Sequence, residues 1–239
     1  METKLERISQ LSRENPNMVF TSIGHLINKE MLKSCHEAMD EEKAVGIDGV
    51  TKEEYSRNLN QNLESLVERL KKKSYKPKPA RLVEIPKDNG KMRPLSIYSY
   101  EDKLVQEALR RILEAVFEPC FYDEMMGFRP NRSCHKAIQK LNTMIQSKPV
   151  NYVLDADIKG FFDHMDHEWI IRFIESKIKD PNITRLVRRE YIQCLSPAKK
   201  YKLYKSSINK SIHFVQRSRA ANRDNSVLML SSTYCYCLD

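Results

Sequence analysis

The chain has 239 residues and a formal net charge of +9, with 41% hydrophobic and 31% charged residues. This length suits one large domain or two small ones with a buried core, and the charge suits a polyanionic partner, although solubility alone would also account for it. The charged N-terminus, the lack of a bilayer-length apolar run and six scattered cysteines argue against secretion or membrane insertion and predict a reducing, cytoplasmic location.

The N-terminal part of the chain is predicted to be helical. Two helices flank the break at Asn15-Pro16, and the second carries apolar residues at helical spacing over residues 27–39. After a turn at residues 46–49, Thr51 and Glu54 form a capping-box pattern for a further helix. Packing is the expected role of the helix over residues 27–39.

Three lysines close the helix that follows Thr51. They come after a stripe that is predicted to be buried, formed by Leu59, Leu63, Leu66, Val67 and Leu70. Lysines at a helix C-terminus interact favourably with the helix dipole, and lysines also contact phosphates. For Lys71, Lys72 and Lys73, the sequence favours the dipole interaction and phosphate contact equally.

A β-hairpin is predicted next. Two extended runs, residues 82–86 and 91–97, are joined by Asp88-Asn89-Gly90, and Asn-Gly between such runs is a strong hairpin signal. Lys87 and Arg93 lie on either side of this turn. A stiff hairpin can aim both cations at the same phosphates, whereas two cations on a hairpin alone are more often solvated surface.

A long helix and a turn come after the hairpin. Residues 102–117 carry one wide apolar face, and Pro119 ends the helix. Ser133 can then cap another helix, which places Arg129 and Arg132 near a helix start, where backbone amides point at anions. Template phosphate contact is the favoured role of the two arginines, with surface charge as the alternative.

Four aspartates lie between Val153 and His167. If residues 153–158 form a strand, Asp155 and Asp157 share one open face, because side chains alternate across a strand. Mg²⁺ prefers carboxylate, water and phosphate oxygens, so this face can serve as a metal platform. The alternative is a strand end with solvated acids, in which Asp163 and Asp166 cap the next helix. Two further helices are expected around the break at residues 180–182.

These blocks, taken together, resemble a known family. Residues 157–167 resemble the first palm motif of reverse transcriptases, most closely those encoded by group II introns. Residues 85–95 are similar to that family's fingers hairpin, residues 127–133 to its next signature and residues 46–50 to the block that opens its conserved region. The family carries out RNA-templated DNA synthesis and often assists intron splicing. The resemblance covers about residues 43 to 195.

The resemblance implies an α+β fold with right-hand polymerase fingers and an incomplete palm. The chain would be helix-rich, with a fingers β-hairpin and a short palm sheet. Residues 1–42 would form an N-terminal helical extension, residues 43–150 the fingers, residues 151–195 a partial palm and residues 196–239 a divergent basic tail.

The resemblance also implies roles for individual residues. Asp157 would hold Mg²⁺, assisted by the backbone of Ile158, and Lys87 with Arg93 would bind the incoming triphosphate. An aromatic residue would lie under the sugar of that nucleotide and exclude ribonucleotides, with Phe161 as first choice and Phe162 as second. The implied partners are template and primer RNA or intron RNA, and a deoxynucleoside triphosphate in an intact enzyme, with no membrane.

The motif pattern fails after Leu195. Gly160 is the last glycine of the chain, so the glycine-rich loop of a polymerase palm has no counterpart, and the paired aspartates that usually follow Tyr-Ala are absent. Two Mg²⁺ ions need carboxylates from at least two strands. We therefore expect no DNA synthesis by this polypeptide alone. Residues 196–239 could come from a frameshift, a truncated reading frame or a divergent insertion, and no secondary structure is assigned to them.

Two other readings of function stay open. The chain could be a non-catalytic RNA-binding module, either a splicing helper or one half of a split polymerase that needs a complementing polypeptide or a homodimer. It could also be a decayed fragment of marginal stability, because an incomplete palm sheet exposes an unpaired strand edge.

Overall fold

The structure is a computed structural model that describes residues 2–86, 90, 92–158, 166–194, 210–216 and 226–231, with the backbone alone described for residues 2, 153–158, 167, 191–194, 210–216 and 226–231. Its contacts divide the chain into two compact units. The first unit comprises Met1–Cys120 with Asp166–Lys202, and the second comprises Phe121–Met165 with Leu203–Asp239.

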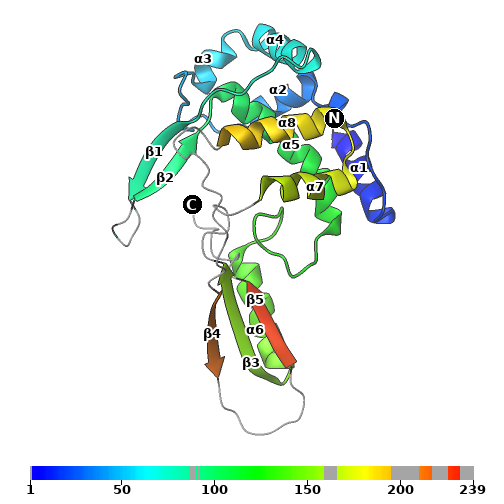
Figure 1. Ribbon diagram of the computed structural model, residues 1–239, viewed down its shortest axis with the longest axis vertical. Helices are drawn as coiled ribbons and strands as arrows, with labels where there is room; N and C mark the ends of the chain where they lie inside the picture. The colour runs from blue at the N-terminus through cyan, green and yellow to red at the C-terminus, as the bar shows by residue number, and fades with distance from the viewer. Residues whose placement is uncertain are drawn as a thin grey trace. The chain divides into compact units, whose positions relative to one another are not determined.

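The first unit is a helical bundle from which a two-stranded ribbon extends (Figure 1). The ribbon consists of β1 (Arg81–Pro86) and β2 (Met92–Ile97), which pair antiparallel. The helices are α1 (Glu2–Glu14), α2 (Lys29–Ala38), α3 (Lys52–Ser56), α4 (Leu59–Lys71), α5 (Tyr100–Phe117), α7 (His167–Lys177) and α8 (Pro181–Cys194), with single 3-10 turns at Gly24–Leu26 and Glu118–Cys120. Among the described residues, no helix has the length and apolar character needed to cross a membrane.

Helix α5 forms the centre of the hydrophobic core. Its apolar residues recur at helical spacing, and five of them are completely buried: Leu104, Val105, Ala108, Ile112 and Val116. Helices α1 and α2 pack against α5, and α8 contributes Ile183, Leu186 and Val187 to the same cluster. Burying each of the larger side chains stabilises the fold by about 1.5–3 kcal/mol. A single core thus contains residues from both sequence segments of the first unit.

A buried carboxylate joins α8 to the segment before α2. Oδ2 of Asp180 accepts hydrogen bonds from the backbone N–H groups of Ile23 at 2.8 Å and Gly24 at 2.6 Å, and Oδ1 accepts one from Asn182 at 2.8 Å. Burial by itself raises the pKa of Asp180, but the backbone donors outweigh burial and hold this pKa below its ordinary value. The ionised side chain therefore satisfies backbone groups of two distant segments.

Most of the helices and the hairpin predicted for this unit are confirmed. The helix predicted after Thr51 is wrong in one respect, because it is two helices, α3 and α4. Thr51 caps α3 by accepting from the N–H of Glu54 at 3.1 Å. The break comes at Asn58, whose φ and ψ of −124° and 35° are not helical, and the side chain of Asn62 donates to the carbonyl of Tyr55 at 3.0 Å.

The second unit combines one helix, α6 (Cys134–Ser147), with a three-stranded sheet (Figure 1). The central strand is β3 (Val150–Ile158), which pairs antiparallel with β4 (Lys210–Gln216) and parallel with β5 (Ser226–Ser231). The prediction of a strand ending at Ile158 is confirmed. Leaving residues 196–239 without secondary structure was wrong, because two apolar runs in this segment pair with β3 on both of its sides.

Side chains of the second unit are little buried in the range where they are described. From Phe121 to Tyr152, Met126 alone is buried, and Ile138 on α6 is 64% exposed. The predicted cap of α6 is confirmed, since Oγ of Ser133 accepts from the N–H of Lys136 at 3.3 Å. The main hydrophobic core consists entirely of residues of the first unit.

Candidate functional site

The ribbon places Arg93 near its tip. Arg93 lies opposite Ile85, one pair before the final pair of Pro86 with Met92, and its side chain is exposed. Gly90 has a φ of 74°, the left-handed conformation that a tight hairpin turn needs and that glycine adopts without strain. Lys87 lies outside the described residues, so its joint action with Arg93 stays a prediction.

The base of the ribbon is fixed by a buried aspartate at the start of α5. Asp102 is 1% exposed. Its Oδ2 accepts from the backbone N–H of Lys78 at 2.9 Å and from the hydroxyl of Ser99 at 2.6 Å, and its Oδ1 accepts from the hydroxyl of Tyr75 at 2.5 Å. Lys78 precedes β1 and Ser99 follows β2, so this one carboxylate holds both ends of the ribbon against α5.

A second buried carboxylate extends this cluster to α8. The Tyr75 hydroxyl also lies 3.2 Å from Oε1 of Glu190. A phenol carries one proton and donates it mainly to one carboxylate, so the approach of a second carboxylate favours an additional proton at this cluster. Burial raises the pKa of Glu190 to about 7, and the nearby charge of Asp102 raises it too, against the opposing effect of a hydrogen bond from Gln106 at 2.8 Å. Of the two carboxylates, Glu190 is the one whose raised pKa favours the protonated form.

The sequence analysis missed this cluster, although one signal was available. Asp102 lies three residues before Val105 and seven before Leu109, which places a carboxylate on the apolar face of α5. An acid on such a face needs buried partners. The partners themselves, Tyr75 and Glu190, are too far away in the sequence to be found by spacing.

Strand β3 carries the predicted metal ligand. Asp157 is paired with Ser211 of β4, and the pairing of β3 with β5 ends at Ala156 and Ser231. The side chains of residues 153–158 are not described, and Phe161 and Phe162 lie outside the described residues. The strand is confirmed, whereas the metal and aromatic roles stay predictions.

In the described strands that pair with β3, no second carboxylate is present to complete a site for two Mg²⁺ ions with Asp157. The paired segments of β4 and β5, with sequences KSIHFVQ and SVLMLS, contain no aspartate or glutamate. Asp157 and the Ile158 carbonyl come from a single strand, whereas two ions need carboxylates from at least two strands. Among the residues described, no group of three or more side chains suited to holding a metal is found.

Both arginines of the predicted template contact have partners within the second unit. Nη1 of Arg129 donates to the carbonyls of Tyr122 at 2.6 Å and Met125 at 2.7 Å. Nη2 of Arg132 lies 2.8 Å from Oδ1 of Asp123. These contacts hold the turn before α6 in place. Phosphate contact by these arginines stays a prediction.

The three lysines lie at the C-terminal end of α4, as predicted. Lys71 is its last residue, and Lys72 follows and pairs with Glu68 at 2.5 Å one turn earlier. Lys73 has a φ of 61°, and its N–H donates to the carbonyl of Leu70 at 3.1 Å, so it ends the helix in the left-handed conformation. The position of the lysines at the end of α4 agrees with an interaction with the helix dipole. Contact of these lysines with phosphates stays a prediction.

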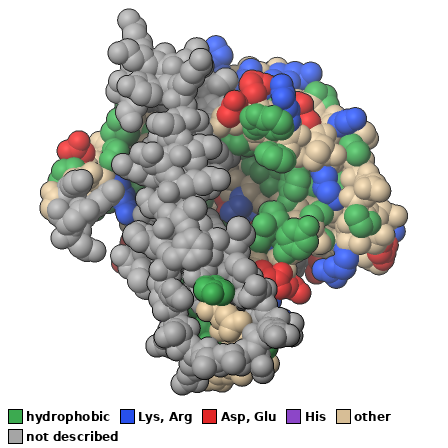
Figure 2. Space-filling view, turned by 60° about the horizontal axis from the view of Figure 1, so that its bottom comes forward, with side chains coloured by type: hydrophobic (Ala, Val, Ile, Leu, Met, Phe, Trp, Pro, Cys, Tyr) green, Lys and Arg blue, Asp and Glu red, His purple; other side chains and the backbone are tan. Residues whose placement is uncertain are grey.

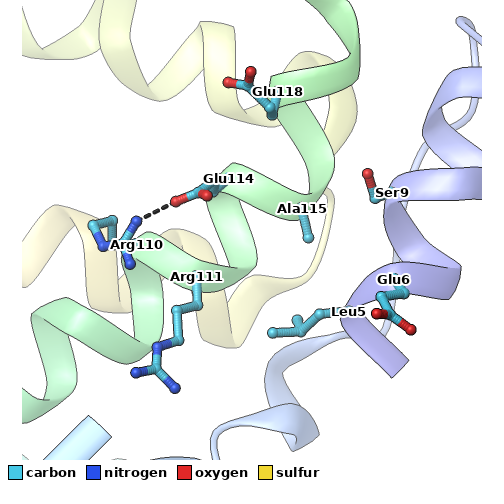
Figure 3. A pocket seen from close by; sticks show the side chains of 8 residues that line it. All are labelled: Leu5, Glu6, Ser9, Arg110, Arg111, Glu114, Ala115 and Glu118. Atoms are coloured by element: carbon cyan, nitrogen blue, oxygen red, sulfur yellow. Dashed lines mark hydrogen bonds and ion pairs between the residues drawn. The ribbon is translucent and has the colours of Figure 1, made fainter. Parts of the chain in front are cut away.

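A pocket of about 240 Å³ lies between α1 and α5 (Figure 3). Its lining includes Leu5 and Ser9 of α1, and from α5 Arg110, which is paired with Glu107 and Glu114. This volume is below the range of about 300–1,000 Å³ that is usual for ligand sites. A second lining cation, Arg111, is paired with Glu107 as well, so both cations of the pocket are neutralised and offer no net charge for a phosphate.

In comparison with known proteins, one family match covers both the ribbon and β3. A match to the family described as reverse transcriptase (RNA-dependent DNA polymerase) covers residues 85–214, so it continues past Leu195, where the resemblance had been taken to end. Group II intron-encoded protein LtrA of Lactococcus lactis subsp. cremoris is 36% identical over 185 residues, which are 77% of this chain and 31% of that protein. The uncharacterized 91 kDa protein in cob intron of Schizosaccharomyces pombe is 33% identical over 189 residues, covering 78% of this chain and 23% of that protein. The chain spans less than a third of the length of either relative.

Proposed function

The chain belongs to the reverse transcriptase family, and on that premise we propose that it supplies the fingers and the opening part of the palm of a group II intron-type RNA-directed DNA polymerase. The observation that carries this proposal is a single family match, residues 85–214, that includes both the Arg93 ribbon and the Asp157 strand. On this proposal residues 43–150 are fingers and β3 is the first palm strand.

The proposed roles follow from the chemistry of the residues. Arg93, on a ribbon fixed at its base by Asp102, binds the triphosphate together with Lys87. Asp157 and the carbonyl of Ile158 hold Mg²⁺ in a completed enzyme, where the ion would neutralise charge on the reacting phosphate. The sugar is screened by Phe161, or by Phe162 as second choice. In a completed enzyme Phe161→Ala then admits ribonucleotides, and unchanged sugar selectivity rejects this assignment.

These 239 residues alone do not polymerise DNA on this proposal, because the strands beside β3 bring no second carboxylate. The test is primer extension with purified protein, Mg²⁺, an RNA template, an annealed primer and deoxynucleoside triphosphates. We expect no product. Product that disappears in Asp157→Ala would overturn the proposal of inactivity, whereas product that persists in this variant points to a contaminating polymerase and calls for repurification.

A second candidate is an RNA-binding module that works without catalysis, as a maturase-like helper or as half of a split polymerase. It is favoured by the missing second carboxylate together with the kinship to intron-encoded proteins. Its partners are template and primer RNA or intron RNA, with a complementing polypeptide or a second copy of this chain. RNA affinity that is unchanged in Asp157→Ala supports this candidate, and affinity that requires Mg²⁺ and Asp157 contradicts it.

A further inference from the structure

Glu190 is the buried carboxylate with the poorest set of hydrogen-bond donors. Among the described residues three carboxylates are buried, those of Asp102, Asp180 and Glu190. Asp180 accepts from several backbone N–H groups, and Asp102 accepts from a backbone N–H and two hydroxyl groups. Glu190 accepts from Gln106 at 2.8 Å and otherwise faces the Tyr75 hydroxyl, whose proton is directed to the nearer Asp102. The ionised form of Glu190 is therefore poorly compensated.

A proton on Glu190 completes a directed chain of hydrogen bonds. When Oε1 is protonated, Glu190 donates to the Tyr75 oxygen over 3.2 Å, and Tyr75 donates to Oδ1 of Asp102 over 2.5 Å. Oε2 then still accepts from Gln106. Loss of the proton leaves a single phenol hydrogen between two carboxylates that are 1% and 7% exposed. Ionisation therefore favours a state in which Glu190 has moved away from Tyr75 and reached water.

The charged groups around Glu190 do not take the place of this proton. In the part of the chain that the structure describes, Asp102 of α5 and Tyr75 of the segment before β1 are the titratable groups that face Glu190 from other elements. The charge of Asp102 raises the pKa of Glu190 further, and burial together with both acids raises the pKa of Tyr75, which therefore keeps its proton. On α8 itself, Arg189 donates to backbone carbonyls and Arg188 pairs with acids of α7. On the face drawn in Figure 2, by contrast, acidic side chains lie next to basic ones.

Two neighbouring residues of α8 hold the segment that leads into the ribbon. Nη1 of Arg189 donates to two carbonyls of this segment, including that of Tyr75, and Glu190 contacts the Tyr75 hydroxyl. From Tyr75 the chain passes through Pro77 and Pro79 to β1. Each proline fixes its own φ and restricts the residue before it, so this connection is stiff. A displacement of Tyr75 is therefore transmitted to the base of the ribbon.

We propose that Tyr75 and Glu190 form a proton-operated latch between α8 and the base of the ribbon, which is closed while Glu190 carries a proton and opens when Glu190 ionises. In the open state Asp102 still accepts from Lys78 and Ser99, so the ribbon stays attached to α5 and loses its contact with α8. The latch depends on these contacts and not on the proposed function. It makes the mobility of the ribbon depend on pH near neutrality, because the pKa of Glu190 is raised to about 7.

Amide hydrogen exchange of the full chain tests the latch. Exchange is measured at pH 5 and pH 8, corrected for the intrinsic amide rate at each pH, and repeated in low, non-denaturing urea. Exchange through a local opening responds weakly to urea, because little surface is exposed, whereas exchange through global unfolding rises steeply. Glu190→Gln imitates the protonated acid, because its NH₂ group donates to Tyr75 while its carbonyl accepts from Gln106. The control is Glu37→Gln, at an exposed position on α2.

In the wild type we expect residues 75–86 and α8 to exchange about tenfold to a hundredfold faster at pH 8 than at pH 5, with a weak response to urea, while α2 responds steeply. Glu190→Gln removes this rise and Glu37→Gln retains it. The latch is overturned by a wild type without the rise, by an equal rise in Glu190→Gln, or by exchange in residues 75–86 and α8 that responds to urea as steeply as α2.

Infrared spectroscopy of the wild type gives a second measurement that does not depend on the folding of a variant. Exposed carboxyl groups are ionised at pH 6, whereas a buried Glu190 with a pKa of about 7 is mostly protonated. We expect the band of a protonated carboxyl group at pH 6 and its loss by pH 8. Absence of this band at pH 6 overturns the latch.

Discussion

The two units of the molecule differ in how they bury their side chains. The first unit packs its helices around α5, and its core also encloses the hydrogen-bonded acids Asp102, Glu190 and Asp180. In the second unit, among the side chains described from Phe121 to Tyr152, Met126 alone is buried, while the backbone of β3 is paired on both sides. The first unit is held mainly by side-chain packing, and the second, as far as it is described, by strand pairing.

The two proposed functional contacts therefore belong to units that differ in how many side chains they bury. The ribbon with Arg93 is built on the packed unit, and the strand with Asp157 belongs to the unit with few buried side chains. We therefore expect changes in the first unit to cost more stability than matched changes in the second. Unfolding and hydrogen-exchange measurements test this expectation.

The largest effect is expected for Leu104→Ala. Leu104 is completely buried on α5, and truncating such a side chain costs about 2–5 kcal/mol, because burial is lost and a cavity remains. The matched change in the second unit is Ile138→Ala, at a position that is 64% exposed, where we expect a change within about 0.5 kcal/mol. Urea unfolding followed by circular dichroism measures both. Equal losses of unfolding free energy would mean that side-chain packing stabilises the second unit as much as the first.

A pH-dependent loss of stability is expected from Glu190. Its pKa is raised from 4.5 to about 7, chiefly by burial, so protonation stabilises the folded state. This contribution is fully present below pH 4.5 and is lost as the pH rises through about 7, and linkage sets its full size at roughly 3 kcal/mol, most of which is lost between pH 5 and pH 8. Glu190→Gln keeps a neutral hydrogen-bonding group and removes this loss, as urea unfolding at pH 5 and pH 8 will show. The control Glu37→Gln, at an exposed position on α2, retains the wild-type pH dependence, and a wild type equally stable at both pH values contradicts the protonated Glu190.

Features of the fold could be predicted when their sequence signal lies within one short segment of the chain. The periodic stripes of α4 and α5 and the Ser133 cap each lie within one element, and the Asn89-Gly90 signal lies between two neighbouring runs. Helices α5 and α6 and the paired strands β1 and β2 formed as predicted, whereas the helix that carries the α4 stripe is separate from the one that Thr51 caps. The cluster of Asp102, Tyr75 and Glu190 could not be derived, because its members come from separate elements. β4 and β5 were missed because a short apolar run does not by itself distinguish a strand from a helix or a loop.

The candidate site follows the same rule. The hairpin and the strand ending at Ile158 were predicted from local patterns, whereas the hydrogen bond from Lys103 to the carbonyl of Ala44 joins segments 59 residues apart. The sequence marked Lys71, Lys72 and Lys73 because they adjoin one another. Cations that come together only in space give no such signal, so the contacts of Arg81, Lys103 and Lys78 with residues 44–48 could be recognised only from the fold.

A smaller effect is expected when the same substitution is made at one aspartate of each unit. Asp180→Asn turns an amide NH₂ group either toward the N–H groups of Ile23 and Gly24, which share Oδ2, or toward that of Asn182. Either orientation leaves buried donors without an acceptor, which costs about 1–3 kcal/mol. The pKa of Asp180 is lowered, so its contribution is present above the ordinary carboxyl value and is lost as the pH falls through the folded value. Asp123→Asn removes the pair with Arg132 at an exposed position, worth about 0–1 kcal/mol. Thermal unfolding at pH 7 and pH 3 distinguishes the two, and a larger loss for Asp123→Asn would contradict the comparison.

The smallest and most discriminating effect concerns two helix caps of similar chemistry. Asn28 caps α2 by accepting from the N–H of Met31 at 2.9 Å, and Ser133 caps α6 by accepting from that of Lys136 at 3.3 Å. Replacing either cap with alanine costs about 1 kcal/mol of local helix stability. Because α2 belongs to the common core, Asn28→Ala lowers the free energy of global unfolding and speeds the exchange of all protected amides of the first unit together. Ser133→Ala speeds exchange over Cys134–Ser147 and leaves the first unit unchanged, because α6 contributes nothing to that core. If exchange in α5 rises as much for Ser133→Ala as for Asn28→Ala, the two units unfold as one, and the separation of stability from the Asp157 strand is wrong.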